Sequence, residues 1–280
     1  EYELPVLLQR IATEEPAVGM VSRELHAPAE DEGVRTVAYK TPDFMLASIQ
    51  DYHPGEPGDR EHCWQATLGP GATIFTTHPA SAGLHESQRP NFWRGNRVLP
   101  RVAQWQDALI ALYALPDDDW MGYTHAYFPI HAFDEFDVRA GWAFARKDKG
   151  YCALTSSRAM TLLRTGNSAR RELRAPGRRA VWLCQMGRSA QDGTFAAFQE
   201  KVLALPVEVD DLAVRWTTLR GETLAVDWTG PFLREGEPVP ALEGRHIENP
   251  HCVAEFPAST MDVMAGGLAM RLDFEPKENS

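Results

Sequence analysis

The sequence lacks the marks of several large protein classes. No window approaches eighteen consecutive apolar residues, which excludes a membrane-spanning helix, and no basic segment followed by an apolar run marks a signal peptide. The G-x-S-x-G, P-loop, G-x-G-x-x-G and H-E-x-x-H motifs are absent, so a nucleotide enzyme or an α/β-hydrolase is not expected. The four cysteines form no C-x-x-C pair, which excludes zinc fingers and favours buried thiols over a disulfide framework.

Positive charge is scarce outside one segment of the chain. The formal net charge is -11, from 28 Lys and Arg against 39 Asp and Glu, which argues against a general nucleic-acid binder. Residues 146–188 depart from this balance, because they hold 11 basic side chains and only two acidic ones, Asp148 and Glu172. Such a segment is either a solvated face that balances acidic neighbours or a site where arginines grip carboxylate or sulfate groups.

Hairpin signals are abundant. Arms rich in Val, Thr and aromatic residues flank tight turns in five places: 62–68 with 72–78, 141–146 with 150–156, 170–174 with 179–186, 212–219 with 223–228, and 260–264 with 268–274. Helical spacing of apolar residues is confined to two segments, 2–13 and 194–204. We therefore predict a mainly β protein, a large antiparallel β-sandwich with an N-terminal helix and one short internal helix.

The first residue is Glu1 rather than Met, so we expect a piece of a longer protein. Residues 1–20 are then a helical stub or linker from a preceding domain, and residues 21–280 form the sandwich. The length fits one large β-domain, and 44% apolar residues are enough for its core.

Side chains suited to chemistry gather around a long irregular loop at residues 79–100. If 62–68 pairs with 72–78, Glu61 and His62 meet His78 at one end of the hairpin, where imidazole beside carboxylate can act as general base or metal ligand. We take Glu61, His62 and His78 as candidate catalytic residues. Candidate substrate-binding residues are those that can stack on a sugar ring or bond its polar groups: His53, His85, Arg89, Asn91, Trp93, Arg94, His125 and Tyr127.

Other clusters receive simpler interpretations. Asp134, Glu135 and Asp137 are expected to form a solvated turn rather than a catalytic carboxylate pair or a calcium site. Trp105 and Trp120 are expected in the core. The ligand spacing supports neither zinc nor calcium, and the cofactor stays open.

The run from Pro54 to Phe75 resembles the central sandwich segment of heparinase II/III-type polysaccharide lyases. It has a glycine- and histidine-containing loop, a strand with an aromatic residue, a turn and a second apolar strand, and the pattern-level similarity covers residues 35–160. The resemblance implies an N-terminal α/α-toroid before an antiparallel sandwich, with helix 2–13 as the last toroid helix. By the same resemblance, His62 matches the sandwich histidine near the cleft. The usual second His and Asp along the first strand are not matched, because Cys63, Trp64 and Gln65 follow.

The chemistry that this resemblance implies is β-elimination at a uronic acid. A base removes the C5 proton, a neutralising group stabilises the enolate-like charge, and an acid protonates the leaving oxygen. We therefore expect the sandwich portion of a polysaccharide lyase that acts on an acidic glycan, with a preceding toroid domain as partner and no nucleic-acid or membrane partner. Two alternatives stay open: a non-catalytic carbohydrate-binding or structural module, and a glycoside hydrolase of similar architecture with Asp or Glu catalysts.

Overall fold

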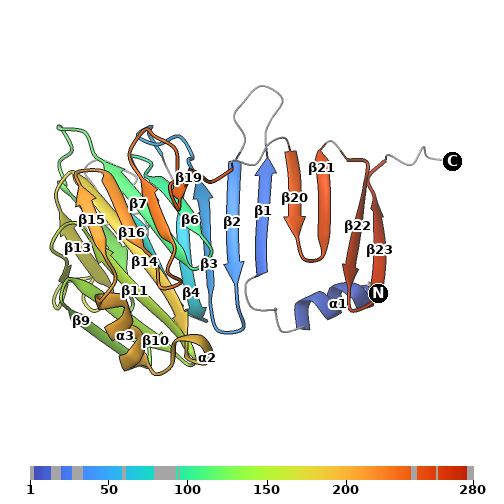
Figure 1. The fold of residues 1–280 in the computed structure, drawn as a ribbon, viewed down its shortest axis with the longest axis horizontal. Coiled ribbons are helices and arrows are strands. Elements are labelled where there is room, and N and C mark those ends of the chain that lie inside the picture. The colour runs from blue at the N-terminus through green and yellow to red at the C-terminus, as the bar shows by residue number, and fades with distance from the viewer. Residues whose placement is uncertain are drawn as a thin grey trace.

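The chain forms stacked antiparallel sheets with little helix, which confirms the predicted mainly β fold (Figure 1). The computed structural model describes residues 3–13, 20–26, 34–58, 61–78, 93, 95–240, 245–256 and 258–275. Its largest sheet has ten strands, which in spatial order are β12 (Thr161–Leu162), β13 (Glu172–Pro176), β8 (Tyr123–Tyr127), β5 (Ala72–Thr77), β4 (Trp64–Gly69), β3 (Met45–Gln50), β2 (Val34–Lys40), β1 (Met20–His26), β20 (Arg245–Asn249) and β21 (Cys252–Phe256).

A second sheet of six strands covers one face of the first. Its strands in order are β6 (Arg101–Trp105), β7 (Ala108–Ala114), β14 (Arg179–Arg188), β11 (Gly150–Ser156), β10 (Trp142–Lys147) and β9 (Glu135–Arg139). Every second side chain of each facing strand points into the shared core, as strand geometry requires. Inside this core the Trp64 indole donates to Thr76 Oγ1 (2.7 Å), which also bonds the Tyr113 hydroxyl (3.0 Å).

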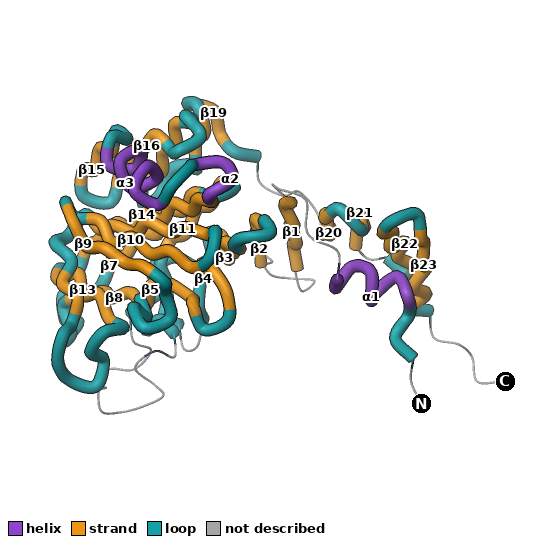
Figure 2. Tube along the Cα trace, turned by 90° about the horizontal axis from the view of Figure 1, so that it is seen from below, coloured by secondary structure: helices purple, strands orange, loops and turns teal. Residues whose placement is uncertain are grey.

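A third layer, which the sequence did not predict, covers the other face of the six-stranded sheet (Figure 2). It consists of a five-stranded sheet and two helices: β15 (Val207–Asp210), β16 (Ala213–Thr217), β17 (Thr223–Val226), β18 (Leu233–Arg234), β19 (Glu237–Pro238), α2 (Ser189–Asp192) and α3 (Phe195–Leu203). Buried aromatic side chains of both layers, among them Phe144, Phe198 and Trp216, fill the interface. The helix predicted over 194–204 is α3, and its cap is Thr194, whose hydroxyl accepts from the Ala197 amide (3.2 Å).

A buried ion pair joins this third layer to the sandwich. Arg220, in the turn between β16 and β17, donates from Nε to Asp107 (2.7 Å) and from both terminal nitrogens to Asp192 (2.8 and 3.1 Å). Asp107 lies in the turn between β6 and β7, and Asp192 lies in α2; each is 2% exposed. Burial raises the pKa of Asp107, although Arg220 opposes the shift.

The large sheet continues beyond the sandwich. Strands β1, β20 and β21 extend it, followed by the hairpin β22 (Thr260–Ala265) and β23 (Leu268–Asp273), and α1 (Val6–Thr13) packs its apolar side chains on this extension (Figure 1). Leu7 contacts a small cluster that includes Cys252 and Ala254 of β21. Residues that are directly paired across neighbouring strands lie on the same face of a sheet, and the pairs that start at Ala254 of β21 lead across the sheet to Ile49 of β3. Ile49 is on the face that the six-stranded layer leaves uncovered, so α1 lies on that face too. Figure 2 likewise has α1 on the opposite side from α3.

Four of the five predicted hairpins are confirmed, and one is wrong. β4–β5, β10–β11, β16–β17 and β22–β23 pair as expected. Residues 170–174 and 179–186 do not pair with each other, because β13 bonds β8 and β12 in the large sheet whereas β14 bonds β7 and β11 in the second. The turn at Pro176 and Gly177 therefore carries the chain from one sheet to the other.

The prediction of buried thiols is confirmed. All four cysteines are buried and free, namely Cys63, Cys152, Cys184 and Cys252. Burial raises the pKa of Cys63 to about 12, so its thiol stays protonated at neutral pH. No helix among the described residues is both long and apolar enough to cross a bilayer.

Candidate functional site

The candidate site lies on the face of the ten-stranded sheet that is turned away from the six-stranded layer, which we call the open face. Strand pairing brings its polar and aromatic residues together: Phe75 of β5 is paired with Tyr127 of β8, and Thr77 is paired with His125. β13 adds Glu172 opposite Tyr127. Most of the chemistry predicted from the sequence falls on this face, because alternate residues of β5 and β8 point to the same side.

His125 is fully buried on the open face, and both of its ring nitrogens are bonded. Nδ1 bonds Glu172 Oε1 (3.1 Å), and Nε2 bonds Thr77 Oγ1 (2.8 Å). The Trp93 ring covers the imidazole, stacked at a centroid distance of 4.2 Å and an interplanar angle of 8°. A carboxylate only accepts, so Nδ1 carries the hydrogen and the neutral ring accepts from Thr77 at Nε2.

The titration of this pair follows from its surroundings. Burial lowers the pKa of His125, so the imidazole is neutral at pH 7. Burial would raise the pKa of Glu172, but its hydrogen bond from His125 and its ion pair with Arg174 (2.6 Å) outweigh burial and hold the pKa below its usual range. Neither ring nitrogen of His125 is left for a substrate.

His78 has the same structural character. Its Nε2 bonds Asp119 Oδ1 (2.8 Å), its Nδ1 faces the Tyr123 carbonyl (3.2 Å), and its side chain is 1% exposed. Arg97 completes the cluster with a 3.1 Å ion pair to the same Asp119 oxygen. Burial lowers the pKa of His78, and the pairing with Asp119 opposes that shift. The geometry is that of a structural histidine, and it leaves no nitrogen for the catalytic role expected from the sequence.

His62 differs from these two histidines. Its Nε2 bonds the Trp93 carbonyl (2.7 Å), and its ring packs at 4.5 Å from the Phe75 ring. A carbonyl only accepts, so Nε2 carries the hydrogen, and the neutral ring has its lone pair on Nδ1. The side chain is half-buried, so it remains within reach of a ligand on the open face.

A hollow on the open face lies beside His62. It has a volume of about 290 Å³ and is floored by small side chains of β2 and β3, among them Thr36, Ala38 and Ala47. His62 and Gln65 form its polar side. Of the histidines that the structure describes, His62 is the one that lines this hollow.

The remaining predicted residues fall into three groups. Tyr127 joins the aromatic cluster, stacked at 5.2 Å on Phe75 and edge-on to Trp93 at 5.3 Å. Glu61 and His78 are linked through Asn96, whose side-chain amide donates to the Glu61 carbonyl (2.7 Å) and accepts from the His78 backbone amide (2.9 Å). The start of β4 and the end of β5 therefore meet, as expected. His85, Arg89, Asn91 and Arg94 lie outside the described residues.

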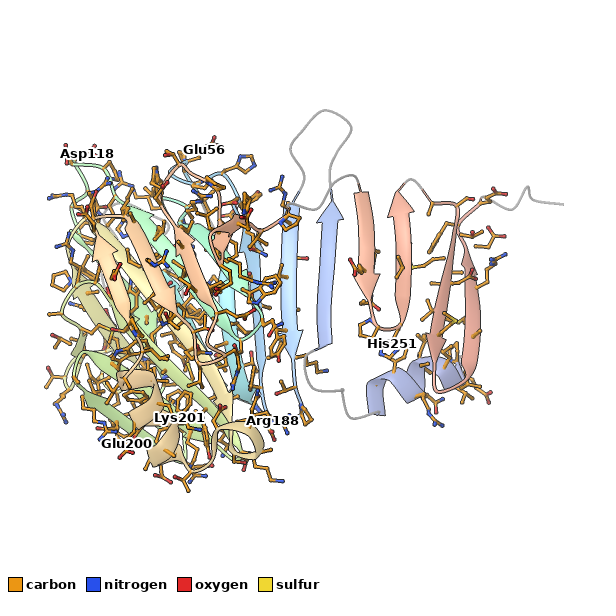
Figure 3. The ribbon with its side chains drawn as sticks, viewed as in Figure 1. Glu56, Asp118, Arg188, Glu200, Lys201 and His251 are labelled. Atoms are coloured by element: carbon orange, nitrogen blue, oxygen red, sulfur yellow. The ribbon has the colours of Figure 1, made fainter. Side chains whose placement is uncertain are left out.

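His53 lies apart, in the loop that follows β3. Its ring packs edge-on to Tyr52 at 4.7 Å and is 3.7 Å from the Glu56 carboxylate. Glu56 is at the end of the sandwich opposite to Glu200 (Figure 3). Among the described residues, no contact links His53 to His62.

The acidic run after β8 is exposed to solvent as expected, but it is not a turn throughout, because Glu135 and Asp137 lie on the edge strand β9. Asp134 pairs with Lys147 (2.8 Å) and Glu135 with Arg146 (2.8 Å), all near the surface. Within the described ranges, no three His, Cys, Asp or Glu side chains gather as metal ligands do. Sequence reasoning missed Asp119 and Glu172 as partners of His78 and His125, which lie 41 and 47 residues away with no motif to join them.

Comparisons of the chain with known proteins gave no match. No protein-family model matches it, and no curated protein or solved structure is significantly similar.

Proposed function

We propose that the chain is the sandwich portion of a polysaccharide lyase that cleaves a uronic-acid glycan by β-elimination. The observation that carries the proposal is His62, a half-buried histidine with its lone pair on Nδ1, beside a hollow on an open sheet face. The rings of Phe75, Trp93 and Tyr127 next to it offer the aromatic surface on which sugar rings stack. The resemblance of residues 54–75 to heparinase II/III-type lyases supports the same assignment.

In the proposed reaction His62 is the base. The Trp93 carbonyl holds the Nε2 hydrogen, which orients the ring and leaves Nδ1 to accept the C5 proton of the uronate. The C5 proton is acidic because it lies next to the carboxylate, and a donor to that carboxylate stabilises the charge that develops as the proton leaves. The C5 electron pair then forms the C4=C5 double bond, the C4–O bond breaks, and the leaving oxygen takes up a proton from water or from an acid of the cleft. His78 and His125 keep the surrounding strands in place and take no part in proton transfer.

The proposal includes an α/α-toroid domain that precedes this chain and ends in α1. Because α1 lies on the open-face side of the extension, a domain that continues from its first turn would stand on the side of the sheet that carries His62. Leu4 and Val6, which are 44% and 67% exposed, offer that domain apolar contacts.

The test compares two histidine variants of the full gene product, including whatever is encoded before Glu1. With a panel of uronate glycans, the wild type is expected to release unsaturated product, and His62→Gln is expected to lower kcat by about 100-fold or more, the range of a lost general base. His131→Gln is the matched control, because His131 is an exposed histidine in the turn after β8. Equal rates for wild type and His62→Gln would remove His62 from the mechanism.

A further inference from the structure

The central part of the arginine-rich segment, residues 158–178, follows one edge of the large sheet. Between Lys149 and Gln191 the only acidic residue is Glu172, which is buried and committed to His125 and Arg174. Five other arginines of this segment have no carboxylate partner among the described ion pairs: Arg158, Arg164, Arg170, Arg171 and Arg178. All but Arg171 are exposed.

The topology places these arginines at the two ends of β12 and β13. The strands are antiparallel, with Thr161 opposite Arg174, and β12 is the outermost strand of the sheet. Arg158 and Arg178 therefore lie at one end of this edge, and Arg164 and Arg170 lie at the other. The five residues of β13 separate the two ends by about 16 Å at the usual strand rise.

Local hydrogen bonds hold the arginines without neutralising them. Arg158 Nε donates to the Arg179 carbonyl (2.8 Å), and Arg178 Nη2 donates to the Asp119 carbonyl (3.2 Å). At the other end, the Arg170 amide donates to the Leu163 carbonyl (2.8 Å), which closes the loop between β12 and β13. Carbonyl oxygens carry no formal charge, so the guanidinium charges remain available to an anion.

An exposed aromatic ring lies at the Arg178 end. Trp120, expected in the core from the sequence, is 49% exposed. The turn that carries it is anchored, because the Gly122 amide donates to Asp119 Oδ2 (2.7 Å) and the Gly177 amide donates to the Gly122 carbonyl (2.7 Å). Asp118 of the same turn lies at the outer end of the sandwich (Figure 3). The anchored backbone of this turn presents an exposed aromatic ring on which a sugar can stack.

We propose that this edge, formed by Trp120, Arg158, Arg164, Arg170 and Arg178, is a binding track for an acidic glycan. The guanidinium groups at its two ends bind carboxylate or sulfate groups on sugars about 16 Å apart, and the Trp120 ring stacks on a sugar between or beside them. The choice of a glycan as occupant rests on the proposed function. It also fits the charge of the edge, because guanidinium groups are complementary to the carboxylate or sulfate groups of an acidic glycan.

Protection of the sheet edge does not account for the arrangement. A sheet edge is protected by a very short edge strand or by charged side chains on the edge strand. β12 is two residues long, Thr161–Leu162, and carries none. The unpaired arginines flank it in the adjoining loops, where they can reach a ligand that crosses the edge.

The test measures binding to this chain by titration calorimetry with three probes: a heparin oligosaccharide, an alginate oligosaccharide of equal length and a single-stranded DNA of equal charge. We expect at least one glycan to bind, and expect both Arg164→Gln/Arg170→Gln and Arg158→Gln/Arg178→Gln to weaken binding about tenfold, as for the loss of two charge-assisted contacts. Trp120→Ala is expected to weaken it about fivefold. Thermal unfolding of each variant verifies that it is folded.

Two controls separate this proposal from the function proposed above. Arg271→Gln removes one positive charge at an exposed arginine paired with Asp262 on β22, away from the edge, and it is expected to leave the affinity unchanged. His62→Gln is also expected to leave edge binding unchanged. A His62→Gln variant as active as the wild type, with edge binding intact, would overturn only the lyase proposal. The binding track would be overturned if no glycan bound, if Arg271→Gln lost as much glycan affinity as the edge variants, or if DNA bound as tightly as either glycan.

Discussion

Replacement of Arg220 by Met tests how the third layer is held on the sandwich. Arg220 is the cation between Asp107 and Asp192, which are each 2% exposed and lie on two different elements. Met keeps the apolar stem and removes three charge-assisted hydrogen bonds, which leaves two buried carboxylates without their cation. Loss of one partner of a buried ion pair costs about 3 to 5 kcal/mol, and because Arg220 is 18% exposed we expect about 3 kcal/mol.

The loss should depend on pH with a definite sign. Burial raises the pKa of Asp107 in the folded wild type, and removal of Arg220 raises it further. A carboxyl with a folded-state pKa above its unfolded value destabilises the protein more as pH rises, so the variant should lose most at neutral pH and recover as pH falls toward about 4.

Urea unfolding at several pH values measures both effects. Arg271→Met is the control, since its partner Asp262 is 57% exposed and such surface pairs contribute less than about 1 kcal/mol. A loss of less than about 1 kcal/mol for Arg220→Met, or a loss that is the same at pH 7 and pH 4, would refute the account of this junction.

Three further predictions concern buried positions in the sandwich and its neighbouring layers. Thr76→Val leaves the Trp64 indole and the Tyr113 hydroxyl without their shared partner, and it should cost about 2 kcal/mol in urea unfolding. Burial lowers the pKa of His125, so the unfolded state takes up protons first and the Tm should fall as pH drops below about 6.5; an unchanged Tm down to pH 5 would contradict this. Gly187→Ala places a Cβ 2.5 Å from the Phe198 ring in α3, and calorimetry should register a loss of about 2 kcal/mol.

The sequence predicted the local part of the fold and missed the long-range part. Hairpins such as β4–β5 are encoded by alternation and by their turn residues, so four of five could be recognised. The segment from 170 to 186 has the same signals, but its two arms pair with β8 and β7 in different sheets. The pairing partner of each arm depends on which distant strands lie beside it in the fold, and the local sequence pattern does not contain that information. The pairing of β1 with β20, more than 200 residues apart, is hidden for the same reason.

The candidate site was predicted in its residues more than in its geometry. His62 and His125 lie on the open face and His78 lies at the end of β5, and all three come near one another because β4, β5 and β8 are neighbours. Their different roles come from partners that are distant in the sequence: Asp119 and Glu172 take up the nitrogens of His78 and His125, whereas His62 bonds a backbone carbonyl. Trp120 shows the converse error, since an aromatic residue after an acidic turn gives no sign of whether it points inward.

The nature of the product ends tests the central claim most directly. Cleavage of a uronate glycan by the full gene product should create an unsaturated uronide, seen as rising ultraviolet absorbance in step with new reducing ends, and His62→Gln should suppress both together. New reducing ends without ultraviolet absorbance would identify a hydrolase. Binding without any new ends, across the whole panel of uronate glycans, would identify a non-catalytic module, and either result would contradict the account.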